Sequence, residues 1–267
     1  MNHDIDKKQK LHHLIHYREW ADSGYEKYEG DINPESIWYW MHTYCLDEID
    51  LFFRSILNKS SFLTVGDGHC AREAAHIKRK WGHLVHASDF SLPLIKIAFD
   101  KGLIDGYSAQ DMNNLGFRDE AFDYVLVKES LHHMSRPYQG LYEMLRVAKK
   151  GAVVIEPNGD NDAKYRYNDF EPTGNYMYTF SSHELIKAGI AFGYKYFVVG
   201  YTLIFFGYHN YETIKAGKIE EEKQRLMGVD KGFAHPSHKP LLIVLFFRDR
   251  EIFDMMDVPN KFVRVSI

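Results

Sequence analysis

The hydrophobic and polar positions of the chain change their period along its length. In residues 1–60 the apolar side chains recur at helical spacing, and Pro34 follows Asn33 where a helix could begin, because proline fits the first helical position. From residue 62 to residue 156, short apolar runs alternate with amphipathic segments. This alternation predicts strands joined by helices, and therefore right-handed crossovers in a mostly parallel sheet.

The apolar runs are expected to form seven strands, with helices between them. Runs such as VLV and AVVI are continuously apolar, which is typical of strands covered on both faces. The expected strands are residues 62–65, 84–88, a short segment near 107, 122–127, 152–156, 194–206 and 241–247, the last two antiparallel to each other. The expected helices are residues 71–81, 92–101, 138–148, one opened by Ser181 or Ser182 with Glu184 in a capping box, and 211–226.

The whole pattern predicts one α/β unit with additions. Residues 1–60 are expected to form a helical N-terminal cover, and residues 61–250 a Rossmann-like core whose seven-strand sheet is mostly parallel with an antiparallel last strand. Residues 158–180 are rich in Asn, Asp, Gly and Tyr and are expected to form an inserted loop or lid. The C-terminal tail, residues 251–267, receives no element.

Composition and charge mainly exclude certain partners and structural classes. The net charge is −4 and the pI is near 6.4, so no basic field favours nucleic acid. The two cysteines, Cys45 and Cys70, form neither a disulfide framework nor a CxxC pattern, which suggests a reducing compartment. A polar N-terminus and the shortness of the longest apolar run, residues 241–247, argue against a signal peptide and a membrane helix. We expect a cytoplasmic protein whose partner is a small molecule, with neither nucleic acid nor membrane.

The most informative stretch links the first two expected strands. Gly66-Asp67-Gly68 follows a β-branched strand, and Asp89 ends the next strand. Glycines let the chain turn tightly and approach a ligand closely, the following helix offers its N-terminal amides, and an acid at the tip of the second strand can accept hydrogen bonds from both ribose hydroxyls. This spacing predicts a nucleoside-type cofactor, and taken alone it also fits NAD.

Four blocks of the chain resemble the class I S-adenosylmethionine-dependent methyltransferases, particularly the small-molecule group called type 11. They are the glycine loop, Asp89 in HASDFS, Asp111 in AQDMNNLGF, and the pair FRDEAFDYVLVKESLHHM and RPYQGLYEMLRVAKKGAVVIEPN. The resemblance spans residues 62–156 and continues weakly to Arg248. It departs from the pattern at the third glycine, which is Cys70. It implies an enzyme with S-adenosylmethionine as cofactor.

At the methionine end of that cofactor, the resemblance implies contacts from the glycine loop. Gly66 and Gly68 would meet the methionine portion through backbone groups, and Lys128 would border it at the tip of the fourth strand. The acid that usually stands two residues before the first glycine is Thr64 here. Asp67 is therefore a hypothesis for the missing contact to the α-amino group.

At the nucleoside end, the resemblance implies three kinds of contact. Asp89 would hold the ribose diol, and Asp111 would take the adenine amino group. Phe90 and Met112 would lie on the two faces of the adenine ring. Tyr17, in the N-terminal segment that folds over the cofactor in this family, would close that side, although helix packing is an equal alternative.

The candidate catalytic residues are His132 and His133, which follow the fourth expected strand at the carboxyl edge of the sheet, where open α/β folds place their ligands. Methyl transfer is an in-line displacement, so the enzyme mainly positions the acceptor. A hydroxyl acceptor must also lose its proton, which suits histidine. A cap or packing role is the alternative, and only one of the two rings is expected to face the pocket. With Glu129 they make a poor metal cage, so no metal is expected.

The function predicted from these observations is S-adenosylmethionine-dependent methylation of a small molecule. O-methylation of a hydroxylated acceptor such as a sugar or sugar nucleotide is favoured, because the polar insert carries Tyr165, Tyr167, Tyr176 and Tyr178 as candidate lining residues. Three alternatives stay open: an NAD-dependent oxidoreductase, a non-catalytic S-adenosylmethionine-binding protein, and an RNA or protein methyltransferase.

Overall fold

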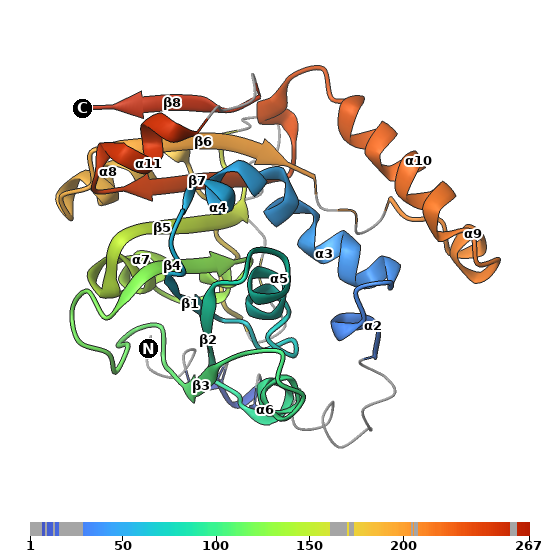
Figure 1. Ribbon diagram of the computed structural model, residues 1–267, viewed down its shortest axis with the longest axis horizontal. Helices are drawn as coiled ribbons and strands as arrows, with labels where there is room; N and C mark the ends of the chain where they lie inside the picture. Colours follow the sequence, from blue (N-terminus) through green and yellow to red (C-terminus); the bar gives the residue numbers. More distant parts are fainter. Residues whose placement is uncertain are drawn as a thin grey trace.

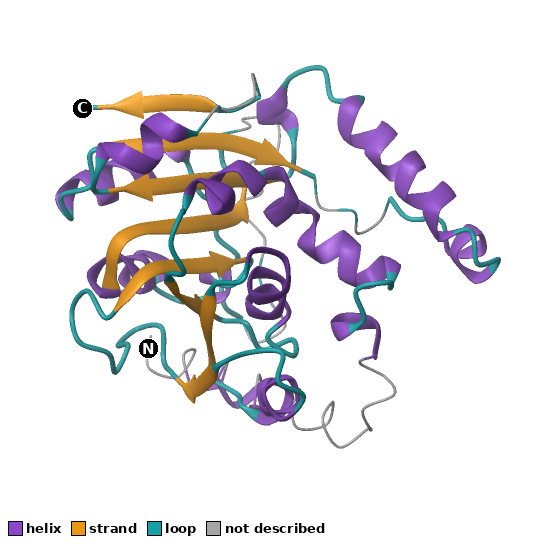
Figure 2. Cartoon of the chain, in the orientation of Figure 1, coloured by secondary structure: helices purple, strands orange, loops and turns teal. Residues whose placement is uncertain are grey.

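A twisted sheet with helices on both of its faces forms the body of the molecule (Figures 1 and 2). The structure is a computed structural model that describes residues 7, 8, 10–12, 14, 15, 29–160, 170, 174–203, 205, 208–256 and 261–267. Within these residues, every helix is too short or too polar to cross a membrane.

The sheet has eight strands in the order β3-β2-β1-β4-β5-β7-β6-β8. They are β1 (Ser61–Val65), β2 (Leu84–Asp89), β3 (Gly106–Ala109), β4 (Phe122–Lys128), β5 (Ala148–Pro157), β6 (Tyr196–Thr202), β7 (Leu241–Phe247) and β8 (Val263–Ser266). The neighbours from β3 through β5 are parallel, whereas β7 is antiparallel to β5 and β6, and β8 is antiparallel to β6. The seven expected strands are all present, and the eighth comes from the tail that was left unassigned.

The helices match the expected order, with most ends within a few residues of the prediction. They are α2 (Glu29–Ile32), α3 (Ile37–Glu48), α4 (Asp50–Ser55), α5 (Arg72–Trp81), α6 (Pro93–Asp100), α7 (Pro137–Val147), α8 (Ser182–Ala191), α9 (Tyr211–Lys215), α10 (Ile219–Lys231) and α11 (Arg250–Met255), with the 3-10 turns η2 (Leu131–His133) and η4 (Pro236–His238). The single helix expected over 211–226 is two helices, α9 and α10, since the chain turns at Gly217, where φ is +73°.

Two apolar cores fill the space on either side of the sheet. One joins α3, α4, α5, α6 and α11 to the sheet face that carries Phe62 and Tyr124. The other joins η2, α7 and α8 to the opposite face, which carries Val125 and Val127. The helices of the N-terminal cover therefore pack against the sheet. A smaller core, which includes Met41 and Phe205, ties α3 to α10.

Two helix starts differ from the prediction for local reasons. The segment around Pro34 is a turn, and α3 begins three residues later with Ser36 as its cap, because the Ser36 hydroxyl accepts a hydrogen bond from Trp38 N. Ser181 does precede α8, but its side chain makes no cap hydrogen bond. The amide of Ser182 instead donates to the carboxylate of Asp160. Asp160, which follows the end of β5, therefore caps the helix in place of the expected capping box.

The turn before β4 offers a test of backbone strain. Glu120 is exposed and has φ of +53°, a conformation that costs a non-glycine residue roughly 1–2 kcal/mol. We expect Glu120→Gly to raise the free energy of unfolding by about 1 kcal/mol, measured by urea denaturation. The control is Arg118→Gly in the same turn, where φ is negative; it should lower stability. Equal effects of both changes would contradict the strain assignment.

Candidate active site

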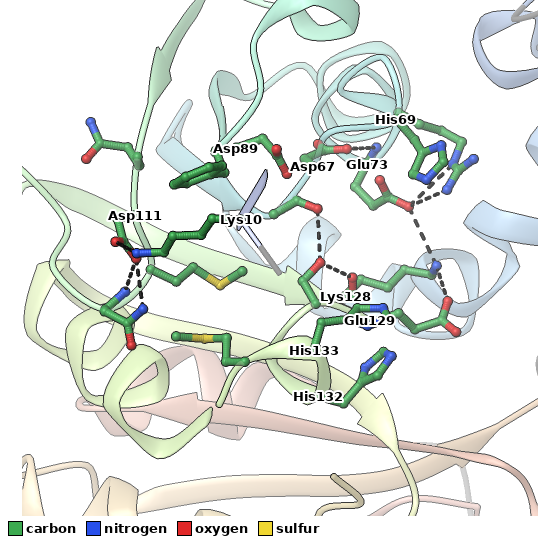
Figure 3. A pocket seen from close by; sticks show the side chains of 18 of the residues that line it. Lys10, Asp67, His69, Glu73, Asp89, Asp111, Lys128, Glu129, His132 and His133 are labelled. Atoms are coloured by element: carbon green, nitrogen blue, oxygen red, sulfur yellow. Dashed lines mark hydrogen bonds and ion pairs between the residues drawn. The ribbon is translucent and has the colours of Figure 1, made fainter. Parts of the chain in front are cut away.

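A cavity of about 400 Å³ opens at the carboxyl ends of β1, β2 and β4. In Figure 3, Asp111 and Lys10 lie at one end of it, Asp89 and Asp67 lie near the middle, and Glu73, Lys128 and Glu129 lie at the other end. This is the edge of an open α/β sheet at which ligands bind, and the volume falls in the range of small-molecule sites.

The glycine loop is held against the turn that follows β4. The backbone at Gly66 has φ of +73°, and a Cβ there would lie 2.5 Å from Cβ of Ser130 and 3.0 Å from Cε of Met112. The hydroxyl of Ser130 donates to the carbonyl of Gly66 at 3.0 Å. Only glycine therefore fits at this position. Ser130, which sequence reasoning did not single out, fixes the loop.

The third position of the glycine pattern keeps its unusual backbone although the residue is Cys70. Cys70 has φ of +57° and Ala71 has φ of +51°, so two consecutive non-glycine residues are left-handed, at a cost of roughly 1–2 kcal/mol each. Both side chains are fully buried, and this burial offsets the strain. The loop thus follows the glycine pattern in its shape even where the sequence departs from it.

Asp67 lies in the cavity wall, but its carboxyl group faces the start of α5. Oδ2 accepts hydrogen bonds from Ala74 N and from the Thr64 hydroxyl, both at 2.9 Å, and Oδ1 accepts one from Glu73 N at 3.3 Å. Asp67 thereby caps the helix, because Ala71 at the N-cap position has no side-chain acceptor. The hypothesis that Asp67 contacts the α-amino group of a cofactor is not favoured by this arrangement.

Asp89 ends β2 in a buried position beside the loop. Its Oδ1 accepts a hydrogen bond from Ser91 N at 2.8 Å, and the amides of Phe90 and Gly68 also donate to this carboxyl group. Burial outweighs these hydrogen bonds and raises the pKa of Asp89 to about 6. Gly68 was expected to meet the cofactor, but it is buried and lies outside the cavity wall. Its amide instead donates to the carboxyl group of Asp89.

The raised pKa of Asp89 makes ligand binding pH-dependent. Ribose hydroxyls donate to the carboxylate, and a proton held on Asp89 competes with them. We expect the dissociation constant of S-adenosylhomocysteine to rise about tenfold from pH 7 to pH 5, since one unit below a pKa of about 6 only about a tenth of Asp89 is ionised. Calorimetric titration at both values measures this. The Asp89→Asn variant should bind weakly with a flatter profile; an unchanged profile would contradict the assignment.

Asp111 lies at the opposite end of the cavity and already has partners. Its carboxylate forms an ion pair with the ammonium of Lys10 and accepts hydrogen bonds from Asn113 N and Nδ2, both at 2.9 Å. Partial burial would raise the pKa of Asp111, but these hydrogen bonds lower it. Lys10 also lies 5.5 Å from the ring centre of Phe90. An adenine amino group could reach Asp111 only if Lys10 moved aside.

The other end of the cavity is charged and was not anticipated. Arg72 and Glu73, in the first turn of α5, meet Lys128 and Glu129 at the end of β4. Lys128 Nζ lies 2.5 Å from Glu129 Oε2 and 3.7 Å from Glu73 Oε1. Burial would lower the pKa of Lys128, but the two carboxylates raise it above its ordinary value. Lys128 therefore borders the cavity with its side chain as well as its backbone.

His132 is oriented by a buried acid. Glu156, at the end of β5, is 0% exposed, and its Oε1 accepts hydrogen bonds from Ser130 N at 2.9 Å and Leu131 N at 2.8 Å. Its Oε2 lies 2.8 Å from Nδ1 of His132. With Glu156 acting as an acceptor, Nδ1 is the donor of this pair, and Nε2 carries the lone pair of the neutral ring. His132 itself lines the cavity.

Both histidines line the cavity, so the expectation that only one would face it is wrong. They lie in the short turn η2, and their ring centres are 4.0 Å apart. The insert braces this turn from outside, since Asn175 Nδ2 donates to the carbonyl of His133 at 2.6 Å. Tyr176 and Tyr178 do not line the cavity, and Tyr178 instead packs over this turn, its amide donating to the carbonyl of His132.

Most of the predicted site residues thus meet in one cavity. Those that line it are Gly66, Asp67, Asp89, Phe90, Asp111, Met112, Lys128, His132 and His133. Tyr17, Trp20, Tyr165 and Tyr167 fall outside the described residues. Sequence reasoning missed Glu73 and Glu156. The only signal for Glu156 was an acid at the end of a strand that is otherwise apolar.

Comparison with known proteins decides between the cofactor classes. Residues 63–155, about a third of the chain, match the type 11 family described as a methyltransferase domain. Over these residues the chain is similar to that domain in sequence and has the class I methyltransferase fold. They contain β1 through most of β5, and with them the glycine loop, Asp89, Asp111 and both histidines. S-adenosylmethionine is the methyl donor of this fold class, which favours it over NAD.

Two curated relatives cover a short part of the domain. Both are demethylmenaquinone methyltransferases, from Renibacterium salmoninarum and Paenarthrobacter aurescens. Each is 35% identical over 71 residues, which is 27% of this chain and 30% and 28% of the respective relative. The chain therefore matches less than a third of the length of these relatives.

Solved structures share the fold over a longer span. A Haloferax volcanii complex between the Trm112 methyltransferase activator and a candidate methyltransferase gives a TM-score of 0.57 at 16% identity, over 87% of this chain and 97% of the matched one. A phosphoethanolamine N-methyltransferase of Haemonchus contortus, in complex with S-adenosylhomocysteine, gives 0.51 at 13% identity, over 84% and 59%. At such identities the likeness concerns the fold.

Proposed function

We propose that this chain binds S-adenosylmethionine in the described cavity and transfers its methyl group to a hydroxyl of a small molecule, with His132 as general base. The observation that carries the proposal is the 2.8 Å contact between Glu156 Oε2 and Nδ1 of His132, beside the glycine loop. A carboxylate that holds an imidazole in one tautomer is a device for proton transfer, and methylation of a hydroxyl is the type of transfer that requires it.

The residues present fit the cofactor at its nucleoside end. The buried carboxyl of Asp89 ends β2 next to the glycine loop, where it can accept from the ribose hydroxyls. Phe90 and Met112 line the cavity between Asp89 and Asp111 and supply the apolar contacts for a purine. When bound, the cofactor supplies an electrophilic methyl group.

The transfer then follows from positioning and one proton movement. Asp89 and the glycine loop would hold the cofactor, which would supply its methyl group to the acceptor oxygen, with the thioether of S-adenosylhomocysteine as the leaving group. Nε2 of His132 takes the hydroxyl proton, and Glu156 stabilises the imidazolium that forms. The walls of the cavity would limit access of water to the bound cofactor and would align the acceptor.

A sugar or sugar nucleotide remains the acceptor that we propose. Of the tyrosines that suggested it, Tyr176 and Tyr178 do not line the cavity, and Tyr165 and Tyr167 fall outside the described residues. The curated relatives are named for demethylmenaquinone, so a quinone belongs in the same test as the alternative acceptor. A sugar carries a hydroxyl that His132 could deprotonate, whereas a quinone carries carbonyl groups, so the two acceptor types make different demands on His132.

The experiment is an acceptor screen that measures S-adenosylhomocysteine formation. It compares sugar nucleotides, demethylmenaquinone analogues and primary amines under the same conditions. We expect turnover with hydroxylated compounds. Turnover with amines alone would contradict a role for His132 in hydroxyl deprotonation. Tight cofactor binding with no turnover on any compound would favour a non-catalytic binding protein.

A further inference from the structure

We propose that the helical segment near the N-terminus docks on an anionic lipid surface, with Leu11, Leu14 and Ile15 as the side chains that enter the lipid. This inference goes beyond the proposed function and does not depend on it. The expectation that the chain has no membrane partner rested on the lack of an apolar segment long enough to span a bilayer. A helix that lies on the surface of a membrane needs no such length.

An apolar stripe runs along this segment and faces solvent. The described residues of the segment, namely 7, 8, 10–12, 14 and 15, are helical. Leu11, Leu14 and Ile15 are 58%, 42% and 48% exposed. Their spacing of three and four residues places them on one face of the helix. A helix of a globular protein normally buries such a face against its own core, so we infer that this face is covered by something outside the chain.

The charges around the stripe favour an anionic surface. Residues 7–18 contain Lys7, Lys8, Lys10 and Arg18 and no acid, whereas the chain as a whole has a net charge of −4. Lys7 and Lys8 are exposed. Lysines beside an apolar stripe can lay their stems along lipid while their ammonium groups stay at the phosphates. Nucleic acid would match the cations, but it would leave the apolar stripe in water.

The segment also has a defined place beside the cavity. The ammonium of Lys10 pairs with Asp111 and lies 5.5 Å from the ring centre of Phe90, so Lys10 lines the cavity (Figure 3). Leu11 and Leu14 are exposed instead. The helix therefore presents one side to the cavity and its apolar side to solvent. Docking on a membrane would place this end of the cavity beside the lipid surface.

The first test is co-sedimentation of the purified full chain with lipid vesicles. Vesicles of phosphatidylcholine alone are compared with vesicles of phosphatidylcholine and phosphatidylglycerol in equal parts. We expect the partition coefficient to be at least about tenfold higher on the anionic vesicles and to fall with added salt, because salt screens exposed charges. Equal partitioning onto both kinds of vesicle would overturn the proposal, as would the absence of binding to either.

The second test removes the apolar stripe. The triple variant Leu11→Ser, Leu14→Ser, Ile15→Ser should lower the partition coefficient on anionic vesicles at least about tenfold, because it removes the apolar area that enters the lipid. The matched control is Leu57→Ser, since Leu57 is 78% exposed and precedes β1, at the amino ends of the strands. We expect Leu57→Ser to bind as wild type does. An equal loss in both variants would overturn the proposal.

The cations and the fold are tested with the same vesicles. Lys7→Gln combined with Lys8→Gln should lower the partition coefficient on anionic vesicles at least about tenfold, and full binding by this double variant would contradict the role of charge. All of the substituted side chains are exposed, so the melting temperatures of the variants should match that of wild type. A variant that melts earlier is replaced by the single change Leu14→Ser, which should show the same direction of effect.

Sedimentation velocity without lipid distinguishes a membrane from a protein partner. We expect the same sedimentation coefficient for wild type and the triple serine variant. A dimer of wild type that the triple variant fails to form would assign the stripe to a second copy of the chain and overturn the lipid proposal. Cofactor binding plays no part in these measurements, so their outcome is independent of whether the proposed function holds.

Discussion

Replacing Glu156 with Gln is expected to lower the rate of methyl transfer about 100-fold while leaving cofactor affinity within about twofold. The amide oxygen of the new side chain can still accept from Ser130 N and Leu131 N, so its NH₂ group must face Nδ1 of His132. Nδ1 then becomes an acceptor and the ring proton moves to Nε2. The tautomer that accepts a proton from the hydroxyl is lost, although the fold and the cavity remain.

The measurements are single-turnover rates and calorimetric affinities for S-adenosylhomocysteine. Replacing His132 with Ala should lower the rate by about 100-fold or more, and combining it with Glu156→Gln should add little, because Glu156 acts through His132. The control is His133→Ala, which should cost less than about tenfold. A larger loss of rate for His133→Ala than for His132→Ala would show that His133 is the base and would contradict our assignment. Additive losses in the double variant would contradict the coupling.

Replacing Gly66 with Ala is expected to lower the free energy of unfolding by about 3 kcal/mol and to weaken cofactor binding about 100-fold. The new methyl group would lie 2.5 Å from Ser130 Cβ and Oγ, and the backbone there has φ of +73°. Because the hydroxyl of Ser130 also holds the carbonyl of Gly66, the loop can make room only by moving away from the turn after β4. Such a movement would displace the backbone groups that we propose meet the cofactor.

A second glycine separates backbone strain from the clash. Gly102 has φ of +71°, and a Cβ there would meet nothing within 4 Å, so Gly102→Ala should cost only about 1 kcal/mol. Adding Ser130→Gly to Gly66→Ala should restore part of the lost stability, because it removes the atoms that clash. Urea denaturation gives the stabilities and calorimetry gives the affinities. Equal losses at Gly66 and Gly102, without rescue, would contradict the proposed packing.

The order of the elements could be predicted from the sequence because local patterns determine it. Continuous apolar runs identified the strands that are buried on both faces, such as the segment at Val125–Val127, and the β-branched strand before Gly66 located the ligand-binding edge. The last strand, Val263–Ser266, was missed because most of its side chains are exposed and it is an edge strand that pairs only with β6. Its formation depends on a partner distant in sequence, which no local pattern reveals.

The residues proposed to bind the cofactor's nucleoside were easier to predict than the buried acids Glu156 and Glu73. Asp89 and the glycine loop occupy positions that the crossover geometry fixes, whereas Glu156 and Glu73 gain their roles from neighbours brought together by the fold. Glu156 meets the turn after β4 from the adjacent strand β5. The ligand contact of Asp67 stays a prediction: Asp67 lines the cavity, while its carboxyl group accepts hydrogen bonds from Thr64 on β1 and from the first turn of α5.

The central claim is that the cavity binds S-adenosylmethionine, and calorimetric titration of the purified protein with S-adenosylmethionine, S-adenosylhomocysteine and NAD tests it most directly. The account predicts micromolar binding of the first two compounds, with no heat from NAD at the same concentrations, and loss of that binding in Asp89→Ala. Binding of NAD alone would contradict the account and return the glycine loop to its dehydrogenase interpretation.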